Sequence, residues 1–151
     1  MIYLKNKQTN EIKTFEVDNY LQLSKNIRDQ HIEATQDDID TYLLQEAKNS
    51  KIVEIKAAKD EALYLPIDYL DTQFISSEKA SQNILGALVL NGDDNQWLDI
   101  NGNVLVLSRA ELEQLGILIK TQRGIVYNNE STKITAINNA TTIEEVNNIT
   151  W

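Results

Sequence analysis

The chain has 151 residues, of which 42% are hydrophobic and 25% charged, a composition typical of a folded globular domain rather than a disordered segment. It contains no cysteine, which excludes a disulfide framework, a thiolate metal site and a cysteine nucleophile. Its 23 acidic and 14 basic residues give a net charge of −9, which argues against binding to nucleic acid, because that binding depends mainly on lysine and arginine.

Neither a secretion signal nor a membrane span is expected. Residues 1–7 lack the apolar core and the small-residue cleavage site of a signal peptide. The longest nearly uncharged apolar stretch, residues 84–90, is far shorter than the roughly 20 residues that cross a membrane. Together with the absence of cysteine, these features favour a protein of a reducing cytoplasm.

The N-terminal region predicts a β-hairpin followed by a helical arm. In residues 2–17 apolar and polar side chains alternate on both sides of a polar turn, as in two antiparallel strands. From residue 19 to residue 63 the apolar spacing becomes helical, and Thr35 followed by acidic residues indicates the start of a helix. We expect a weak break at residues 49–50 and a partly exposed arm over residues 51–63.

The main boundary is expected near Pro66, the only proline of the chain. Proline cannot donate a hydrogen bond to a sheet, so residues 65–67 predict an edge strand or an extended connector, and residues 74–75 a short extended segment. We therefore divide the chain into an N-terminal hairpin and helical arm, residues 1–62, and a C-terminal α+β domain, residues 63–151.

The C-terminal domain begins with a predicted helix and a predicted β-hairpin. Helical spacing of apolar residues extends over residues 77–90, and Asn91-Gly92 favours a helix end, since both residues tolerate a left-handed conformation. Two apolar strands, residues 96–100 and 103–107, then flank Asn101-Gly102, the sequence that favours a tight hairpin turn.

Two capping boxes predict the remaining helices. Residues 108–111 begin a long helix, which the polar residues 128–133 are expected to interrupt, and residues 142–145 begin a short terminal helix. The predicted fold class is therefore α+β, with an N-terminal hairpin and helices followed by a small domain built of a helix, a β-hairpin and a long helix.

The order of motifs from residue 60 to residue 150 resembles an uncharacterised domain of phage and prophage tail-fibre and tail-fibre assembly proteins. In that family an extended segment leads into a helix, here residues 74–87, followed by a strand with a tryptophan, here Trp97. A long helix and a closing motif, here residues 140–146, complete the pattern. The chain departs from the family at Gly116, Gly124 and Asn128-Asn129, where the family has a more regular helix.

The resemblance implies a partner and a location but no catalytic residue. It implies that the chain is an accessory protein of the tail fibre, acting as an assembly chaperone, as a component of the fibre tip, or as both. The partner would be the tail-fibre protein, with self-association also left open. The chain would act in the host bacterial cytoplasm during assembly and could stay in the virion tail fibre.

No residue pattern predicts catalysis, a cofactor or a metal. His31 is the only histidine and has no nucleophile motif near it, so a surface or capping role is expected. Asp99 would begin a calcium loop, but Val104 and Ala110 occupy its glycine and glutamate positions, so turn chemistry is expected instead. Paired acidic residues lie at helix starts or on solvated helix faces. We therefore expect no enzyme.

The residues predicted to bind a partner are apolar or aromatic: Tyr3, Leu4, Phe15, Trp97 and Trp151. Aromatic residues dominate burial both in cores and at interfaces, which leaves either role open for them. Two other functions also stay open. One is an acidic DNA mimic that inhibits a nucleic-acid enzyme, which the negative charge would suit. The other is a glycan-binding or glycan-cleaving tail module.

Overall fold

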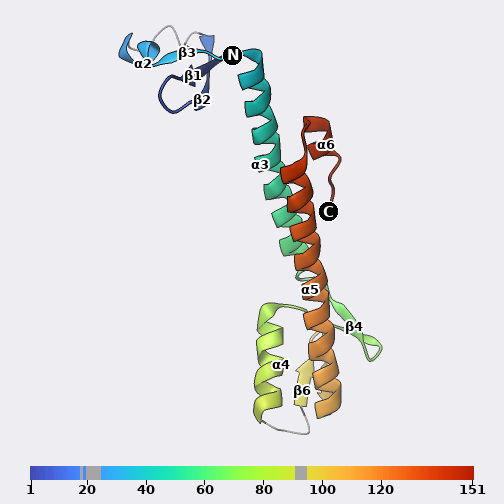
Figure 1. The fold of residues 1–151 in the computed structure, drawn as a ribbon. Helices are drawn as coiled ribbons and strands as arrows, with labels where there is room; N and C mark the ends of the chain where they lie inside the picture. The colour runs from blue at the N-terminus through green and yellow to red at the C-terminus, as the bar shows by residue number, and fades with distance from the viewer. Residues whose placement is uncertain (18, 20–24, 91–94) are drawn as a thin grey trace. The chain divides into compact units, whose positions relative to one another are not determined.

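The computed structural model describes residues 1–17, 19, 25–90 and 95–151, and its mixture of helices and small sheets confirms the predicted α+β class (Figure 1). The chain divides into two compact units, residues 1–51 with 137–148 and residues 52–136 with 149–151. Both units include parts of the same two long helices. The predicted division between residues 62 and 63 is a claim about two domains that fold separately. The packing of the chain does not test whether they do, so this division stays a prediction.

The first unit contains a three-stranded antiparallel sheet with the strand order β2-β1-β3. Its strands are β1 (Ile2–Asn6), β2 (Ile12–Phe15) and β3 (His31–Glu33). The predicted hairpin is confirmed, since Ile2 pairs with Phe15 and Lys5 with Ile12. The strand β3 was not predicted, because the helical spacing was extended through it.

The helical segments of the first unit include α2 (Lys25–Asp29), residues 36–51 of α3 (Gln36–Ala62), residues 137–139 at the end of α5 (Arg109–Asn139) and α6 (Ile143–Asn147). The predicted helix start at Thr35 is confirmed, because its Oγ1 accepts a hydrogen bond from the amide of Asp38 at 3.2 Å. The carboxylate of Asp38 also lies 2.7 Å from Nζ of Lys5 on β1, which links the helix start to the sheet.

The second unit contains two β-hairpins, two helices packed around its larger core, and residues 52–62 of α3. Its remaining elements are β4 (Ile67–Tyr69), β5 (Thr72–Phe74), α4 (Glu78–Leu90), β6 (Asn95–Leu98), β7 (Val104–Leu107) and α5 (Arg109–Asn139), of which residues 109–136 belong to this unit. Seven buried apolar residues form the core: Ile67, Phe74, Ile84, Leu107, Leu112, Leu115 and Ile119. The core therefore joins both hairpins, α4 and the first half of α5.

The two long helices are continuous where the sequence predicted breaks. The expected break at residues 49–50 and the expected interruption at residues 128–133 are both wrong, since α3 and α5 run through them. In α5 the hydroxyls of Thr132 and Thr135 donate to the carbonyls of residues four positions earlier, each at 2.9 Å. The backbone stays helical because burial of the apolar face outweighs the weak helix propensity of these polar residues.

Two turns differ from the predictions. Residues 67–74 form a β-hairpin that was not predicted, with Leu70 and Asp71 at φ values of 51° and 56° in its turn. Its strand β4 begins at Ile67, the last residue of the segment expected to be an edge strand or an extended connector. Leu98 pairs with Val104, so a loop of residues 99–103 replaces the expected two-residue turn at Asn101-Gly102.

The predicted helix end at Asn91-Gly92 lies outside the described residues. No helix in the described part of the chain is long and apolar enough to cross a membrane.

Candidate protein-binding surface

The hairpin of β6 and β7 has apolar side chains on both of its faces. Trp97 and Leu105 form a cross-strand pair that packs against the core of the second unit. On the opposite face Leu98, Val104 and Val106 are 57%, 61% and 60% exposed. Because adjacent residues of a strand point to opposite faces, the four consecutive apolar residues of β7 supply both the core and this outer face. We call Leu98, Val104 and Val106 the outer hairpin face.

The loop that joins the two strands is held by the carboxylate of Asp99. Its Oδ1 accepts hydrogen bonds from the amides of Asn101 and Asn103, each at 2.8 Å, and its Oδ2 accepts one from the side chain of Asn103 at 2.8 Å. These bonds, above all that from the Asn103 side chain, lower the pKa of Asp99 below its ordinary value, so the carboxylate is ionised at neutral pH. The acidic and amide residues of the loop thus serve as turn residues.

The same loop connects this hairpin to the hairpin of β4 and β5. The amide of Ile100 donates to the carbonyl of Gln73 at 2.9 Å, and the hydroxyl of Thr72 donates to the carboxylate of Asp99 at 3.3 Å. We call these two hydrogen bonds the hairpin clasp. The clasp fixes the β6–β7 hairpin to the β4–β5 hairpin. The outer hairpin face therefore loses little conformational freedom when a partner protein binds, which favours binding.

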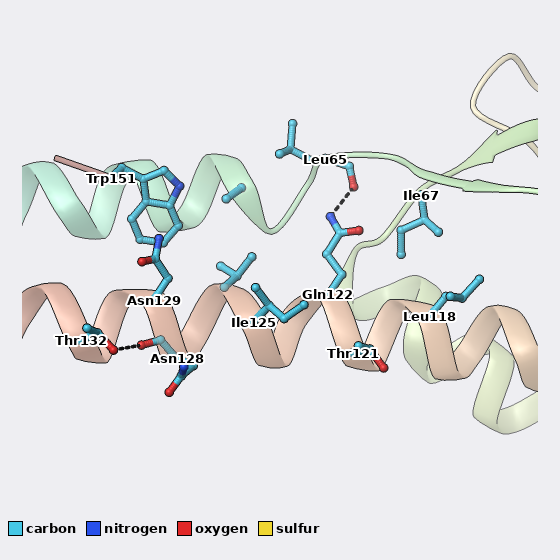
Figure 2. A pocket seen from close by; sticks show the side chains of 12 residues that line it. Leu65, Ile67, Leu118, Thr121, Gln122, Ile125, Asn128, Asn129, Thr132 and Trp151 are labelled. Carbon is cyan, nitrogen blue, oxygen red and sulfur yellow. Dashed lines mark hydrogen bonds between the residues drawn. The ribbon is translucent and has the colours of Figure 1, made fainter.

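A second candidate surface is a groove of about 730 Å³ in the second unit. It lies between the end of α3, Leu65, Ile67 and the middle of α5 (Figure 2). Figure 2 shows the ring of Trp151 beside Asn129 at one end of the groove and Leu118 beside Ile67 toward the other. Near its middle the side-chain amide of Gln122 donates to the carbonyl of Leu65 at 3.3 Å. Trp151 is thus seated on its own chain while 38% of it stays exposed.

The structure places the predicted N-terminal binding residues in the interior and on the flanks of the first sheet. Leu4 is buried, with 3% exposure, so its side chain packs within the first unit. Tyr3 makes an edge-on ring contact with Tyr42 of α3 at 6.1 Å, and Phe15 makes one with His31 at 6.4 Å. These half-buried rings stabilise the unit, and a role in partner binding stays a prediction for all three residues.

The two predicted tryptophans lie in the second unit but on separate surfaces. Trp97 is half-buried against the core, whereas Trp151 lines the groove of α3 and α5. Their roles in partner binding also stay predictions. The outer hairpin face was missed as a site, although the uninterrupted apolar run of residues 104–107 is the signal that both faces of that strand are apolar.

Several acidic residues of the described chain stabilise local structure. Glu111 and Glu145 close capping boxes by accepting from the backbone amides of Ser108 at 2.8 Å and Thr142 at 3.2 Å. The pKa of Glu111 is lowered chiefly by its hydrogen bond with the side chain of Ser108, and the pKa of Glu145 chiefly by its hydrogen bond with the backbone amide of Thr141. Within residues 1–17, 19, 25–90 and 95–151 no group of three or more acidic or histidine side chains could hold a metal ion. His31 lies half-buried on β3 against Phe15.

Comparison with known proteins gives one match. The family described as a domain of unknown function, DUF4376, matches residues 46–150, which is most of the chain. No curated protein and no solved structure matches the chain. The matched segment contains the outer hairpin face, the hairpin clasp and most of the groove around Trp151.

Proposed function

Because the chain belongs to the DUF4376 family, whose function is not assigned, we propose that it is a binding protein of a phage or prophage tail fibre and not an enzyme. In this proposal it binds the tail-fibre protein, either as an assembly chaperone in the host bacterial cytoplasm or as a component of the fibre tip. The resemblance of residues 60–150 to tail-fibre accessory domains suggests this partner.

The outer hairpin face is the observation that carries the proposal. Its three apolar side chains are each more than half exposed, and they lie together on a hairpin of the matched segment. Contiguous exposed apolar surface is costly in water and often marks a site of protein association. A complementary apolar surface on the fibre protein would cover these side chains, as one sheet covers another in a sandwich.

The hairpin also offers backbone groups to a partner. Among the described residues, β6 and β7 form a two-stranded sheet that no third strand extends. Open strand edges can accept an added strand from another protein through main-chain hydrogen bonds. An extended segment of a folding fibre chain fits this mode of binding, which supports a chaperone role in particular.

The first test is co-expression of the tagged full-length chain with the neighbouring fibre gene, followed by affinity purification. We expect the fibre protein to co-purify and its soluble fraction to depend on this chain. Val106→Asp and Leu98→Asp should abolish co-purification, because a charge in an apolar interface must be desolvated without a partner. Circular dichroism should stay unchanged, since both side chains are exposed.

Val53→Asp supplies the matched control, because Val53 is also an exposed valine, at 68%, but lies on α3 and outside the hairpin. This variant should retain the fibre protein. Binding that survives Val106→Asp would refute the outer hairpin face as the site. Absence of any complex with the unaltered chain would refute the fibre proposal and make a nuclease the next partner to test, through the acidic inhibitor alternative.

A further inference from the structure

A third apolar surface of the second unit lies between α4 and α5, which run beside each other in Figure 1. This groove has a volume of about 600 Å³. The nearly buried side chain of Ile84 forms its floor, while Leu85 and Ile117 on its walls are 65% and 50% exposed. We call it the helix-pair groove. The outer hairpin face is not part of it.

The groove residues of α5 form one stripe along the helix. Glu113, Ile117, Lys120, Gly124 and Tyr127 follow one another at intervals of four and three residues, the spacing of a single helix face that meets another helix. Such a stripe with apolar and small residues is the pattern of a helix that packs along a second helix. On this chain α4 supports the stripe from one side, which leaves its outward side open.

Glu113 and Lys120 place opposite charges on this stripe, one on either side of Ile117. The midpoint between them falls between Gly116 and Ile117, about 5 Å along the helix axis from each charge. Two helical turns separate the two residues, too far for them to pair within one helix. Within the described chain neither side chain has an ion-pair or hydrogen-bond partner, and both are exposed.

The other cation of the groove is already engaged by its own chain. The guanidinium of Arg123 donates to the hydroxyl of Tyr127 at 3.3 Å and to the carbonyl of Ser76 at 3.5 Å. It also lies 3.9 Å from the carboxylate of Glu78. Glu113 and Lys120 are therefore the groove charges that remain available to an incoming surface.

We propose that the helix-pair groove binds the same groove of a second copy of this chain, forming a symmetric dimer in which the two α5 helices run antiparallel. A two-fold axis near Gly116 and Ile117 brings Glu113 of each copy to Lys120 of the other, so the surface is complementary to itself. Ile117 and Leu85 of each copy are covered by the apolar wall of the other. This inference does not rest on the proposed fibre partner.

Gly124 fits this arrangement, and packing within the described residues does not require it. A glycine inside a helix costs about 1 kcal/mol relative to alanine. No heavy atom of the described residues lies within 4 Å of the place where its Cβ would be. Its missing side chain leaves room for a side chain of the second copy. Gly116, by contrast, is required by contact with Ile84 within the chain.

The test is sedimentation velocity of the full chain over a concentration series. We expect a monomer–dimer equilibrium that weakens as salt is added, because exposed ion pairs are screened. Glu113→Lys and Lys120→Glu should each raise the dissociation constant about tenfold or more, since each variant places like charges together at two symmetric positions. Circular dichroism should match the unaltered chain for both variants.

Mixing the two variants distinguishes self-association from every other occupant. In an equimolar mixture the substituted side chain at position 113 of one variant would meet the oppositely charged substituted side chain at position 120 of the other. A heterodimer of near-normal affinity should therefore form, and the double variant E113K/K120E should also dimerise. Glu61→Lys and Lys56→Glu, on exposed residues of α3 outside the groove, are the matched controls and should leave dimerisation unchanged.

Three outcomes would overturn the proposal. These are a chain that stays monomeric at the highest concentration, a dimer that is insensitive to both single variants, and a mixture that shows no recovery. The last result would mean that the groove accepts a different surface. Failure of the dimer is separable from failure of the fibre proposal, because Val106→Asp changes the outer hairpin face and leaves the groove charges intact.

Discussion

Two glycines of α5 allow a sharp test of how tightly α4 packs on α5. Both Gly116 and Gly124 lie inside the helix, so replacement by alanine should favour the helical backbone by about 1 kcal/mol at either position. At Gly124 the new methyl group would have no neighbour within 4 Å among the described residues. We therefore expect Gly124→Ala to stabilise the second unit by about 1 kcal/mol, which corresponds to a rise in Tm of about 4–8 °C for a unit of this size.

At Gly116 the same change should have the opposite effect. The new Cβ would lie 3.0 Å from Cγ2 of Ile84, a contact at which one of the two groups must shift. Ile84 is 2% exposed and belongs to the core, so it has little space to move into. Overpacking of this kind costs about 1–3 kcal/mol, which exceeds the helix gain. We expect Gly116→Ala to destabilise the unit by about 1 kcal/mol, a difference of about 2 kcal/mol from Gly124→Ala.

The assay is urea unfolding followed by tryptophan fluorescence. Both tryptophans, Trp97 and Trp151, belong to the second unit, so their emission reports on the unit that contains both glycines. Low protein concentration keeps association from contributing to the measured free energy of unfolding. Equal stabilisation by the two alanine variants would refute the tight contact of α4 with α5.

A double-mutant cycle with Ile84→Ala adds a second check. Ile84→Ala removes the Cγ2 atom and should by itself cost about 2–5 kcal/mol, as expected for a large-to-small change in a core. In that background Gly116→Ala should no longer be destabilising, because the atom that it would meet is gone. A cost that persists in the double variant would mean that the strain comes from another source.

Two further changes test buried polar groups. Ser76→Ala should destabilise the second unit by about 1–3 kcal/mol in urea unfolding, because the fully buried hydroxyl lies 3.0 Å from the carbonyl of Leu63 and 2.5 Å from that of Leu65. The ionised form of Asp99 favours folding, since its pKa is lowered from 3.8, chiefly by the side chain of Asn103. The stabilisation by the ionised carboxylate is fully present above pH 3.8, the ordinary pKa of aspartate. It is lost as the pH falls from 3.8 through the lower pKa of Asp99 in the folded protein. Asp99→Asn should therefore flatten the acid side of the stability profile, and an unchanged acid profile would contradict this role.

Elements whose signals are local could be predicted from the sequence. The capping boxes at Ser108 and Thr142 place serine or threonine and glutamate three residues apart, and the structure contains both. The first hairpin could also be predicted, because alternating apolar residues return after a polar turn. In these segments the neighbouring residues alone supply the hydrogen bonds that fix the backbone.

Elements that depend on distant contacts could not be predicted in this way. The turn of β4 and β5 places Leu70 in the left-handed region, at φ 51°, where a leucine gives no turn signal. Strand β3 forms because it pairs with β1 across the sequence between them. Both long helices continue through polar residues of weak helix propensity. They do so because burial of apolar side chains such as Ile55 and Ile137 stabilises the helical backbone.

The candidate surface was predicted in part. The hairpin that carries it was expected, but the residue predicted to bind a partner was Trp97. Trp97 packs against the core, whereas the exposed apolar side chains lie on the opposite face. Strand pairing decides which residues share a face, and the pairing of Leu98 with Val104 depends on the length of the loop that Asp99 organises. A turn shorter by a few residues would change that pairing and the residues on each face.

The hairpin clasp also has a consequence for the order of events in folding. Its hydrogen bond from Thr72 to Asp99 spans 27 residues, including all of α4, whereas each hairpin closes over only a few. Closing a loop of that length costs about 3 kcal/mol of chain entropy, so the clasp should form after the hairpins and α4 have reached their places. Loss of the clasp should then accelerate unfolding while leaving the rate of folding nearly unchanged. The outer hairpin face would thus be fixed on the β4–β5 hairpin only at the end of folding, so a partner that requires the fixed face distinguishes finished molecules from those still folding.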